Sequence, residues 1–353
     1  MSDAENFGSA RPSAQAEATR FDPSSFVAPW FLRNGHLMTF AGALWPRRFP
    51  ALPDSEARLV EVAPEVRLRL DIHWQPRRAS RPTLLLVHGL EGSSQSNYVR
   101  GAAEKAWRAG FNVVRMNVRN CGDTEHLTPS LYHSGLSGDV RAVAEHLRAT
   151  ESLTEFHLVG FSMGGNMVLK LAGEWGAHPP REVASVVAVC PSLDLARCAD
   201  ALELPANRLY QWRFVGSLKA RLRRKARLFP RFYQADGLGC VRTVREFDEL
   251  FTAPHFGFGT AANYYQQASA LPLVGNIKLP TLTIAAQDDP FIPFDSFRQP
   301  ALVENPNITL LTPEHGGHVG FFASRGPGSA GDEDRYWAEN RIVEFCRSHS
   351  QRR

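Results

Sequence analysis

The Gly-Phe-Ser-Met-Gly motif at residues 160–164 contains the residue types of a nucleophilic serine site. An apolar run at residues 156–159 precedes it, and a helix-forming run at residues 167–172 follows it. A Gly-x-Ser-x-Gly motif between a strand and a helix forms a sharp, strained turn that exposes the serine hydroxyl at the tip of a sheet. The two glycines suit this turn because the flanking positions lie too close together for larger side chains. We therefore predict that Ser162 is a nucleophile.

A serine hydroxyl is a weak nucleophile until a base removes its proton, and an acid usually orients that base. His318 follows the apolar run at residues 308–311 and has glycines on both sides, and we predict that it is the general base. Asp289 follows the apolar run at residues 282–286, in a loop that prolines stiffen. We predict that Asp289 orients the imidazole, because Pro293 stands four residues beyond it, as is usual in such a loop.

Three other residues offer alternatives for the acid and the base. Asp288 is adjacent to Asp289, and adjacent side chains on an extended chain point opposite ways, so either carboxylate could be the acid. His315 competes with His318, and the two could also form a small metal site, but no cysteine or carboxylate cluster completes a ligand set. Asp194 is a further candidate acid, with a helix cap as the alternative interpretation. We expect no metal and no organic cofactor.

A second turn is predicted to supply the oxyanion site. Residues 84–87 form an apolar strand, and His-Gly-Leu-Glu-Gly follows at residues 88–92. A His-Gly turn in this place lets the next backbone N–H point into the site, which predicts the amide of Leu90 as one donor. The amide of Met163 is the second, because the first turn of a helix favours negative charge. We expect His88 to buttress the loop.

The composition agrees with a globular hydrolytic enzyme. The 353 residues are 43% apolar and 22% charged, enough for one large domain with a cap. A net charge of +4 without a nucleic-acid motif argues against nucleic-acid binding. The longest apolar runs fall short of the roughly 18 residues that a membrane span needs, and the polar N-terminus lacks the form of a signal peptide. Five cysteines without a Cys-x-x-Cys spacing favour reduced thiols and a cytoplasmic protein.

The chain divides into a polar N-terminus and one domain. Residues 1–20 are predicted to be disordered, and residues 21–353 to form a single domain. Residues 21–56 contain aromatics and prolines without clean periodicity and are expected to wrap the core. Strands that alternate with helices predict a mostly parallel, doubly wound α/β sheet. Residues 200–270 interrupt this alternation and are expected to form a helical cap over the site. Further elements are expected as a hairpin at 57–74, helices at 98–109 and 139–147, and strands at 111–116 and 186–190.

Residues 208–231, inside the expected cap, contain nine lysines or arginines and no acidic residue. One interpretation is a solvated helix face. The other is a basic, leucine-containing surface that makes peripheral contact with an anionic membrane or an acidic substrate headgroup.

An ordered set of motifs carries a family resemblance. They are FLRNGHLMT at 31–39, HGLEG at 88–92, NVRNCG at 117–122, LYHSG at 131–135, GFSMGGN at 160–166 and GGHVGF at 316–321. With these motifs, the chain from about residue 21 to its end resembles the YheT-like branch of the AB hydrolase superfamily, the AB hydrolase 4 family. The resemblance implies an α/β-hydrolase fold and a serine charge-relay system of Ser162, Asp289 and His318. It also implies carboxylic ester hydrolysis, and some eukaryotic members act on lipids from a membrane anchor.

The predicted function is that of a serine esterase acting through an acyl-serine intermediate on a small acyl ester or a lipid-like substrate. An acyltransferase or a thioesterase would use the same triad, and the sequence does not separate these activities. A non-catalytic binding protein with this fold would usually have lost a triad residue, and all three are present. The acyl chain, the alcohol group and the oligomeric state are not predicted.

Overall fold

The fold is that of a computed structural model, in which residues 21, 23–234, 236–325, 332 and 334–350 are described. The disorder predicted for residues 1–20 concerns a segment outside these described residues. Within the described part of the chain, an eight-stranded sheet has the order β1-β2-β4-β3-β5-β6-β7-β8. Strands β3 to β8 run parallel, and β1 and β2 are antiparallel to their neighbours. The strands are β1 Glu56–Ala63, β2 Val66–His73, β3 Thr83–Val87, β4 Asn112–Met116, β5 Phe156–Phe161, β6 Val183–Val189, β7 Thr281–Ile284 and β8 Ile308–Leu311.

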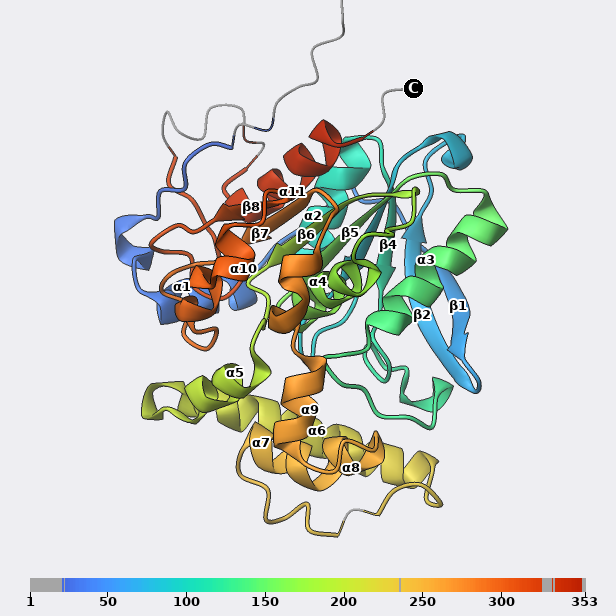
Figure 1. The fold of residues 1–353 in the computed structure, drawn as a ribbon, viewed down its shortest axis with the longest axis vertical. Helices are drawn as coiled ribbons and strands as arrows, with labels where there is room; N and C mark the ends of the chain where they lie inside the picture. The colour runs from blue at the N-terminus through green and yellow to red at the C-terminus, as the bar shows by residue number, and fades with distance from the viewer. Residues whose placement is uncertain (1–20, 22, 235, 326–331, 333, 351–353) are drawn as a thin grey trace, which may run out of the picture.

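Helices cover both faces of this sheet, which confirms the predicted doubly wound α/β architecture (Figure 1). Alternate side chains of β3 point to opposite faces of the sheet, as the pleat of a strand requires. Leu84 and Leu86 pack in the core cluster of α2 and α11, and Leu85 and Val87 pack in the cluster of α3 and α4. Apart from α5 to α9, the α-helices are α1 Gly35–Leu44, α2 Asn97–Arg108, α3 Ser137–Glu151, α4 Met163–Trp175, α10 Pro300–Val303 and α11 Trp337–Ser348.

The cap segment, predicted at residues 200–270, contains the last four residues of α5 and all of α6 to α9. Figure 1 shows α5 to α9 together at one end of the sheet, with α6 running across that end. A short π-helical turn, η5, joins α7 to α8, and such turns often mark functional sites. The bounds are α5 Leu195–Glu203, α6 Arg208–Leu228, α7 Val244–Phe247, η5 Asp248–Thr252, α8 Ala253–His255 and α9 Ala261–Ala268.

Apart from the short helix α10, two helices outside residues 200–270 were not predicted. Residues 21–56 contain α1, whose N-cap Asn34 accepts hydrogen bonds from the amides of His36 and Leu37. Asn34 belongs to a motif that carries the family resemblance, but an Asn followed by an apolar stretch also predicts the start of a helix. The C-terminal helix α11 has nine buried residues in twelve, so its apolar and polar positions do not separate cleanly along the sequence.

The structure bears on the expectations about membrane spans and about the cysteines. Among the described residues, no helix combines the length and the hydropathy that crossing a membrane requires. All five cysteines are unpaired, and only Cys240 is exposed.

Candidate active site

Ser162 occupies a strained turn between β5 and α4. Its φ and ψ are 54° and −117°, a conformation that side-chain-bearing residues rarely adopt. A Cβ atom on Gly160 would lie 2.1 Å from the carbonyl oxygen of Gly164, and one on Gly164 would lie 2.4 Å from that of Val87. The turn is therefore pressed against the end of β3, which confirms that both glycine positions are sterically required.

Replacing Gly164 by alanine is expected to destabilise the protein by about 1–3 kcal/mol, because the new methyl group must displace backbone at the end of β3. Urea unfolding monitored by circular dichroism measures the change. The matched control is Gly216→Ala in α6, where an added Cβ meets no atom within 4 Å. We expect that control to stabilise by roughly 0.5–1 kcal/mol, as alanine does in a helix interior. Equal stability of the Gly164 variant and the wild type would contradict the packing described here.

Asp289 and His318 form a direct pair. His318 Nδ1 lies 2.7 Å from Asp289 Oδ2, and the Asp289 side chain is 1% exposed. The other oxygen, Oδ1, accepts hydrogen bonds from the amides of Phe291 and Ile292 at 3.1 and 3.0 Å, which fixes the carboxylate. An imidazole that donates Nδ1–H to this carboxylate presents Nε2 as a proton acceptor. The pair thus has the arrangement that a general base requires.

The carboxylates of Asp288 and Asp194 accept hydrogen bonds from backbone amides. Asp288 Oδ1 accepts a hydrogen bond from the amide of Gly317 at 2.8 Å, and its Oδ2 lies 3.4 Å from Nδ1 of His315. Burial raises the pKa of Asp288. Asp194 is the N-cap of α5 and accepts a hydrogen bond from the amide of Arg197. The two adjacent aspartates therefore point to different partners, and Asp289 is the one that contacts His318.

The end of β6 connects the serine turn to the histidine loop. The amide of Ser162 donates to the carbonyl of Val189 at 2.8 Å, and the amide of Val319 donates to Sγ of the next residue, Cys190, at 3.4 Å. Within the described contacts of these residues, no hydrogen bond joins the Ser162 hydroxyl to His318. Such bonds are often long in ligand-free enzymes and tighten when substrate binds. The structure thus places Ser162 beside the histidine loop but joins only the Asp–His pair directly.

The loop after β3 lies against the serine turn. A Cβ on Gly89 would be 3.0 Å from Cβ of Ser162, a tighter contact than is usual for a Cβ atom, so the two turns are closely packed. His88 Nδ1 donates to the carbonyl of Gly89 at 2.7 Å, and Nε2 accepts from the amide of Val118 at 3.1 Å. Burial lowers the pKa of His88 to about 4, so the ring is neutral and holds the loop. Met163 is the first residue of α4, and its amide has no acceptor within the helix.

A cavity opens between the sheet end and the cap segment, and its space, with the open solvent at its mouth included, is about 910 Å³. Ser162, Met163 and Leu90 line its floor, and α5, α6, α7, η5 and α9 line its roof. Phe291 also lines the cavity, and its ring centroid lies 4.1 Å from that of His318, so the imidazole is close to the same space. Sequence reasoning did not single out Phe291. The remaining lining residues are mostly apolar: Leu131, Tyr132, His133, Ser134, Ser192, Leu195, Cys198, Ala199, Leu202, Phe214, Leu218, Arg221, Val244, Phe247, Asp248, Thr252, Tyr264, Tyr265 and Ile292.

Asp248 places a carboxylate in the roof of this cavity. It begins η5 and accepts a hydrogen bond from the hydroxyl of Tyr265 at 2.8 Å. Burial raises the pKa of Asp248 to about 6, although the hydrogen bonds to its charged form oppose the shift. The folded protein therefore holds a proton on Asp248 at pH values where the unfolded chain has lost it.

Replacing Asp248 by asparagine is expected to change the pH dependence of stability. A carboxyl whose pKa is raised on folding contributes stability below its unfolded pKa, near 4, and loses it as pH rises through 6. Asparagine does not titrate, so it has no such loss. The free energy of unfolding of the variant, relative to that of the wild type, should therefore rise by on the order of 1–3 kcal/mol between pH 4 and pH 7. Urea unfolding of both proteins across this range measures the difference. A constant difference between pH 4 and pH 7 would contradict this account of Asp248.

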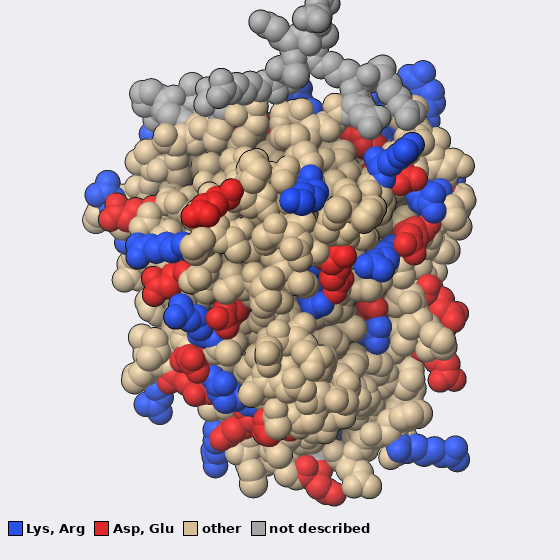
Figure 2. Space-filling model, in the orientation of Figure 1, with Lys and Arg blue, Asp and Glu red and all other residues tan. Residues whose placement is uncertain are grey.

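The basic stretch at residues 208–231 is only partly a solvated face. Arg221 and Lys225 are buried, and Arg224 pairs with Glu125 at 2.6 Å. On the face of the molecule seen in Figure 2, basic and acidic side chains are interspersed, without a continuous basic surface. The cations of this stretch therefore divide between internal pairs and the outer face of α6.

Comparisons with known proteins agree with this geometry. A family model described as alpha/beta hydrolase fold matches residues 82–324. The protein named "Putative esterase YheT" of Escherichia coli is 32% identical over 94% of this chain and 96% of its own length. Human phospholipase ABHD3 is 28% identical over 74% of this chain and 64% of its own length. The structure of esterase Pf2001 from Pyrococcus furiosus superposes with a TM-score of 0.52 at 17% identity, covering 82% of this chain and 91% of that one, which is a likeness of fold.

Proposed function

The chain belongs to the α/β-hydrolase fold family, in its YheT-like branch, the AB hydrolase 4 family, and from this premise we propose that it hydrolyses carboxylic esters through an acyl-serine intermediate. The observation that carries the proposal is the part-buried Asp289–His318 pair at the sheet end that also holds Ser162 on its strained turn. A named esterase and a named phospholipase among the relatives support ester chemistry.

In the proposed mechanism, His318 Nε2 removes the proton of Ser162 as the serine oxygen attacks the ester carbonyl. Asp289 keeps Nδ1 protonated and stabilises the imidazolium that forms. The amides of Leu90 and Met163 bind the oxyanion of the tetrahedral intermediate. The imidazolium then gives its proton to the leaving alcohol, and water releases the acid by the same steps. These roles need no metal and no organic cofactor.

The cavity supports an acyl ester or lipid-like substrate. Its walls are mainly aliphatic and aromatic side chains, which suit an acyl chain, and the serine lies on its floor. We propose that residues 21–353 act as one domain in which residues 200–270 cap this site. The cap segment would then set the acyl-chain length and the alcohol group that fit.

Turnover of p-nitrophenyl esters of increasing chain length and of the matching thioesters, with and without a competing alcohol acceptor, tests the proposal. A rate of free-acid release that is the same with and without the acceptor indicates a hydrolase. A transferred ester as the main product would indicate an acyltransferase, and strong preference for a thioester would indicate a thioesterase. A folded protein that turns over no ester at any chain length would contradict the proposed function.

We further propose that the outer face of α6 makes peripheral contact with anionic lipid. Leu209 and Trp212 are 56% and 75% exposed there, Arg213 is exposed next to Trp212, and Arg223 is exposed about three turns further along the helix. Apolar side chains among cations on one helix face suit the surface of an anionic bilayer. Co-sedimentation with phosphatidylglycerol vesicles, but not with phosphatidylcholine vesicles, is the expected result. Equal recovery with both, unaffected by Trp212→Ala, would contradict it.

A further inference from the structure

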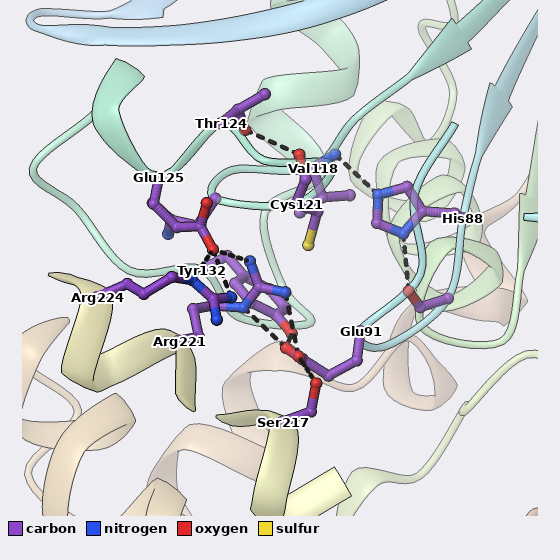
Figure 3. A network of polar contacts seen from close by, with 12 residues as sticks. His88, Glu91, Val118, Cys121, Thr124, Glu125, Tyr132, Ser217, Arg221 and Arg224 are labelled. Carbon is purple, nitrogen blue, oxygen red and sulfur yellow. Dashed lines mark hydrogen bonds and ion pairs between the residues drawn. The ribbon is translucent and has the colours of Figure 1, made fainter. Parts of the chain in front are cut away.

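Glu91, the residue after Leu90, extends a buried carboxylate toward the cap segment. Its Oε1 accepts hydrogen bonds from the hydroxyl of Tyr132 at 2.5 Å and from Nε of Arg221 at 3.0 Å. Its Oε2 accepts from the hydroxyl of Ser217 at 2.5 Å and from Nη2 of Arg221 at 3.1 Å. Figure 3 shows these side chains meeting at Glu91. Three of the four donors come from α6, so this helix is attached directly to the predicted oxyanion loop.

The backbone of Glu91 is itself in a strained conformation. Its φ is 56°, in the left-handed region that side-chain-bearing residues seldom adopt unless surrounding contacts enforce it. Glu91 and Leu90 are the two central residues of a turn closed by the hydrogen bond from the amide of Gly92 to the carbonyl of Gly89 at 3.0 Å. Because both residues belong to this one turn, a change in the conformation of Glu91 would disturb the turn that holds the Leu90 amide.

The charges of Glu91 and Arg221 are both buried, and each stabilises the other. The Arg221 side chain is 9% exposed and lines the cavity, and the Glu91 side chain is 6% exposed. Burial alone would raise the pKa of Glu91, but Arg221 and the hydrogen bonds from Ser217 and Tyr132 hold it below its usual range. A buried charge that loses its partner is strongly unfavourable. Arg221 also lies 3.5 Å from Glu125, but Glu91 is its closer partner and accepts two hydrogen bonds from it. The pair therefore forms when α6 lies over the site.

We propose that Glu91 is a positioning residue that aligns the Leu90 amide with Ser162 only while α6 is docked. The inference rests on the proposed function, since it gives the Leu90 amide its role. The cap segment then does more than enclose substrate. Displacing α6 removes three of the four donors from Glu91 and frees the turn, so closure of the cap and completion of the oxyanion site occur together.

Glu91→Gln is the direct test, because it keeps the size of the side chain but turns an NH₂ group toward donors. We expect kcat to fall on the order of 10- to 100-fold, as when a reacting group is misplaced by about 1 Å. KM should change little, because Glu91 does not line the cavity. Affinity for a trifluoromethyl ketone, which binds serine as an oxyanion, should fall in parallel with kcat/KM. Rates are normalised to active sites titrated with a fluorophosphonate.

Two further variants isolate the pair. Arg224→Gln is the matched control, since Arg224 also lies on α6 and forms an ion pair but does not contact Glu91. Its partner Glu125 keeps its own contact with Arg221 at 3.5 Å in this variant. It should keep wild-type kcat. The double variant Glu91→Gln/Arg221→Gln should lose about as much as the worse single variant, because the two side chains act as one unit.

The outcomes separate this inference from the proposed function. Wild-type protein that neither turns over ester nor reacts with the fluorophosphonate overturns the function and this inference with it. Active wild type, with Glu91→Gln unchanged in kcat and ketone affinity per titrated site, overturns the inference alone. A loss confined to the number of titratable sites shows a structural role only and also overturns it.

Discussion

Ser162→Ala is expected to lower ester turnover by a factor on the order of 10⁵ to 10⁶, leaving only the residual rate that binding and the oxyanion site can support. The reason is that alanine offers no oxygen to form the acyl-enzyme, and the strained turn places no other hydroxyl there. Because the change removes a single atom at a preformed turn, the fold should persist. Steady-state turnover of a p-nitrophenyl ester, with thermal unfolding of the same samples, measures both effects.

Ser192→Ala is the matched control for this loss. Its hydroxyl also lines the cavity, and within the described residues it has no hydrogen-bond partner. We expect this variant to keep most of its turnover, since Ser192 has no base beside it. Loss in both variants to the same degree, or full activity in Ser162→Ala, would show that Ser162 is not the nucleophile.

Asp289→Asn is expected to lower kcat on the order of 10⁴-fold. The carboxylate accepts the Nδ1–H of His318 at 2.7 Å, whereas an asparagine NH₂ in that place would force Nδ1 to accept. The proton would then lie on Nε2, which could no longer take the proton of the serine. Parallel measurement of kcat and of the rate of fluorophosphonate labelling should show the same loss in both.

Asp288→Asn tests the assignment of the acid. Asp288 accepts a hydrogen bond from the amide of Gly317, and the oxygen of asparagine can do the same. This variant should therefore lose much less activity than Asp289→Asn. A larger loss from Asp288→Asn would exchange the roles of the two residues.

Local sequence signals predicted much of the fold. Apolar runs of four to six residues located β3 to β8, and residue alternation located β2, because burial in a sheet leaves a direct mark on composition. Helix α11 was missed because both of its sides are largely buried. The contact of α1 with α6, where His36 Nδ1 lies 3.3 Å from the hydroxyl of Tyr210, joins residues 174 positions apart and has no local signal.

The same distinction holds at the candidate site. Glycine spacing around Ser162 and proline spacing after Asp289 are local, and they selected the two residues whose geometry suits the proposed roles. These roles stay predictions until activity is measured. The ion pair of Glu91 and Arg221 could not be predicted, because Arg221 was one of nine cations in a uniform stretch. Only the docking of α6 shows which of them turns inward.

Mass spectrometry of the acyl-enzyme tests the central claim most directly. A rapidly quenched reaction with a p-nitrophenyl ester should show a burst of nitrophenol, and the protein should gain the mass of one acyl group. Peptide mapping should then place that group on Ser162, and the same mass should be absent from Ser162→Ala. An acyl group on another residue, or turnover with a burst in Ser162→Ala, would contradict the mechanism proposed for this protein.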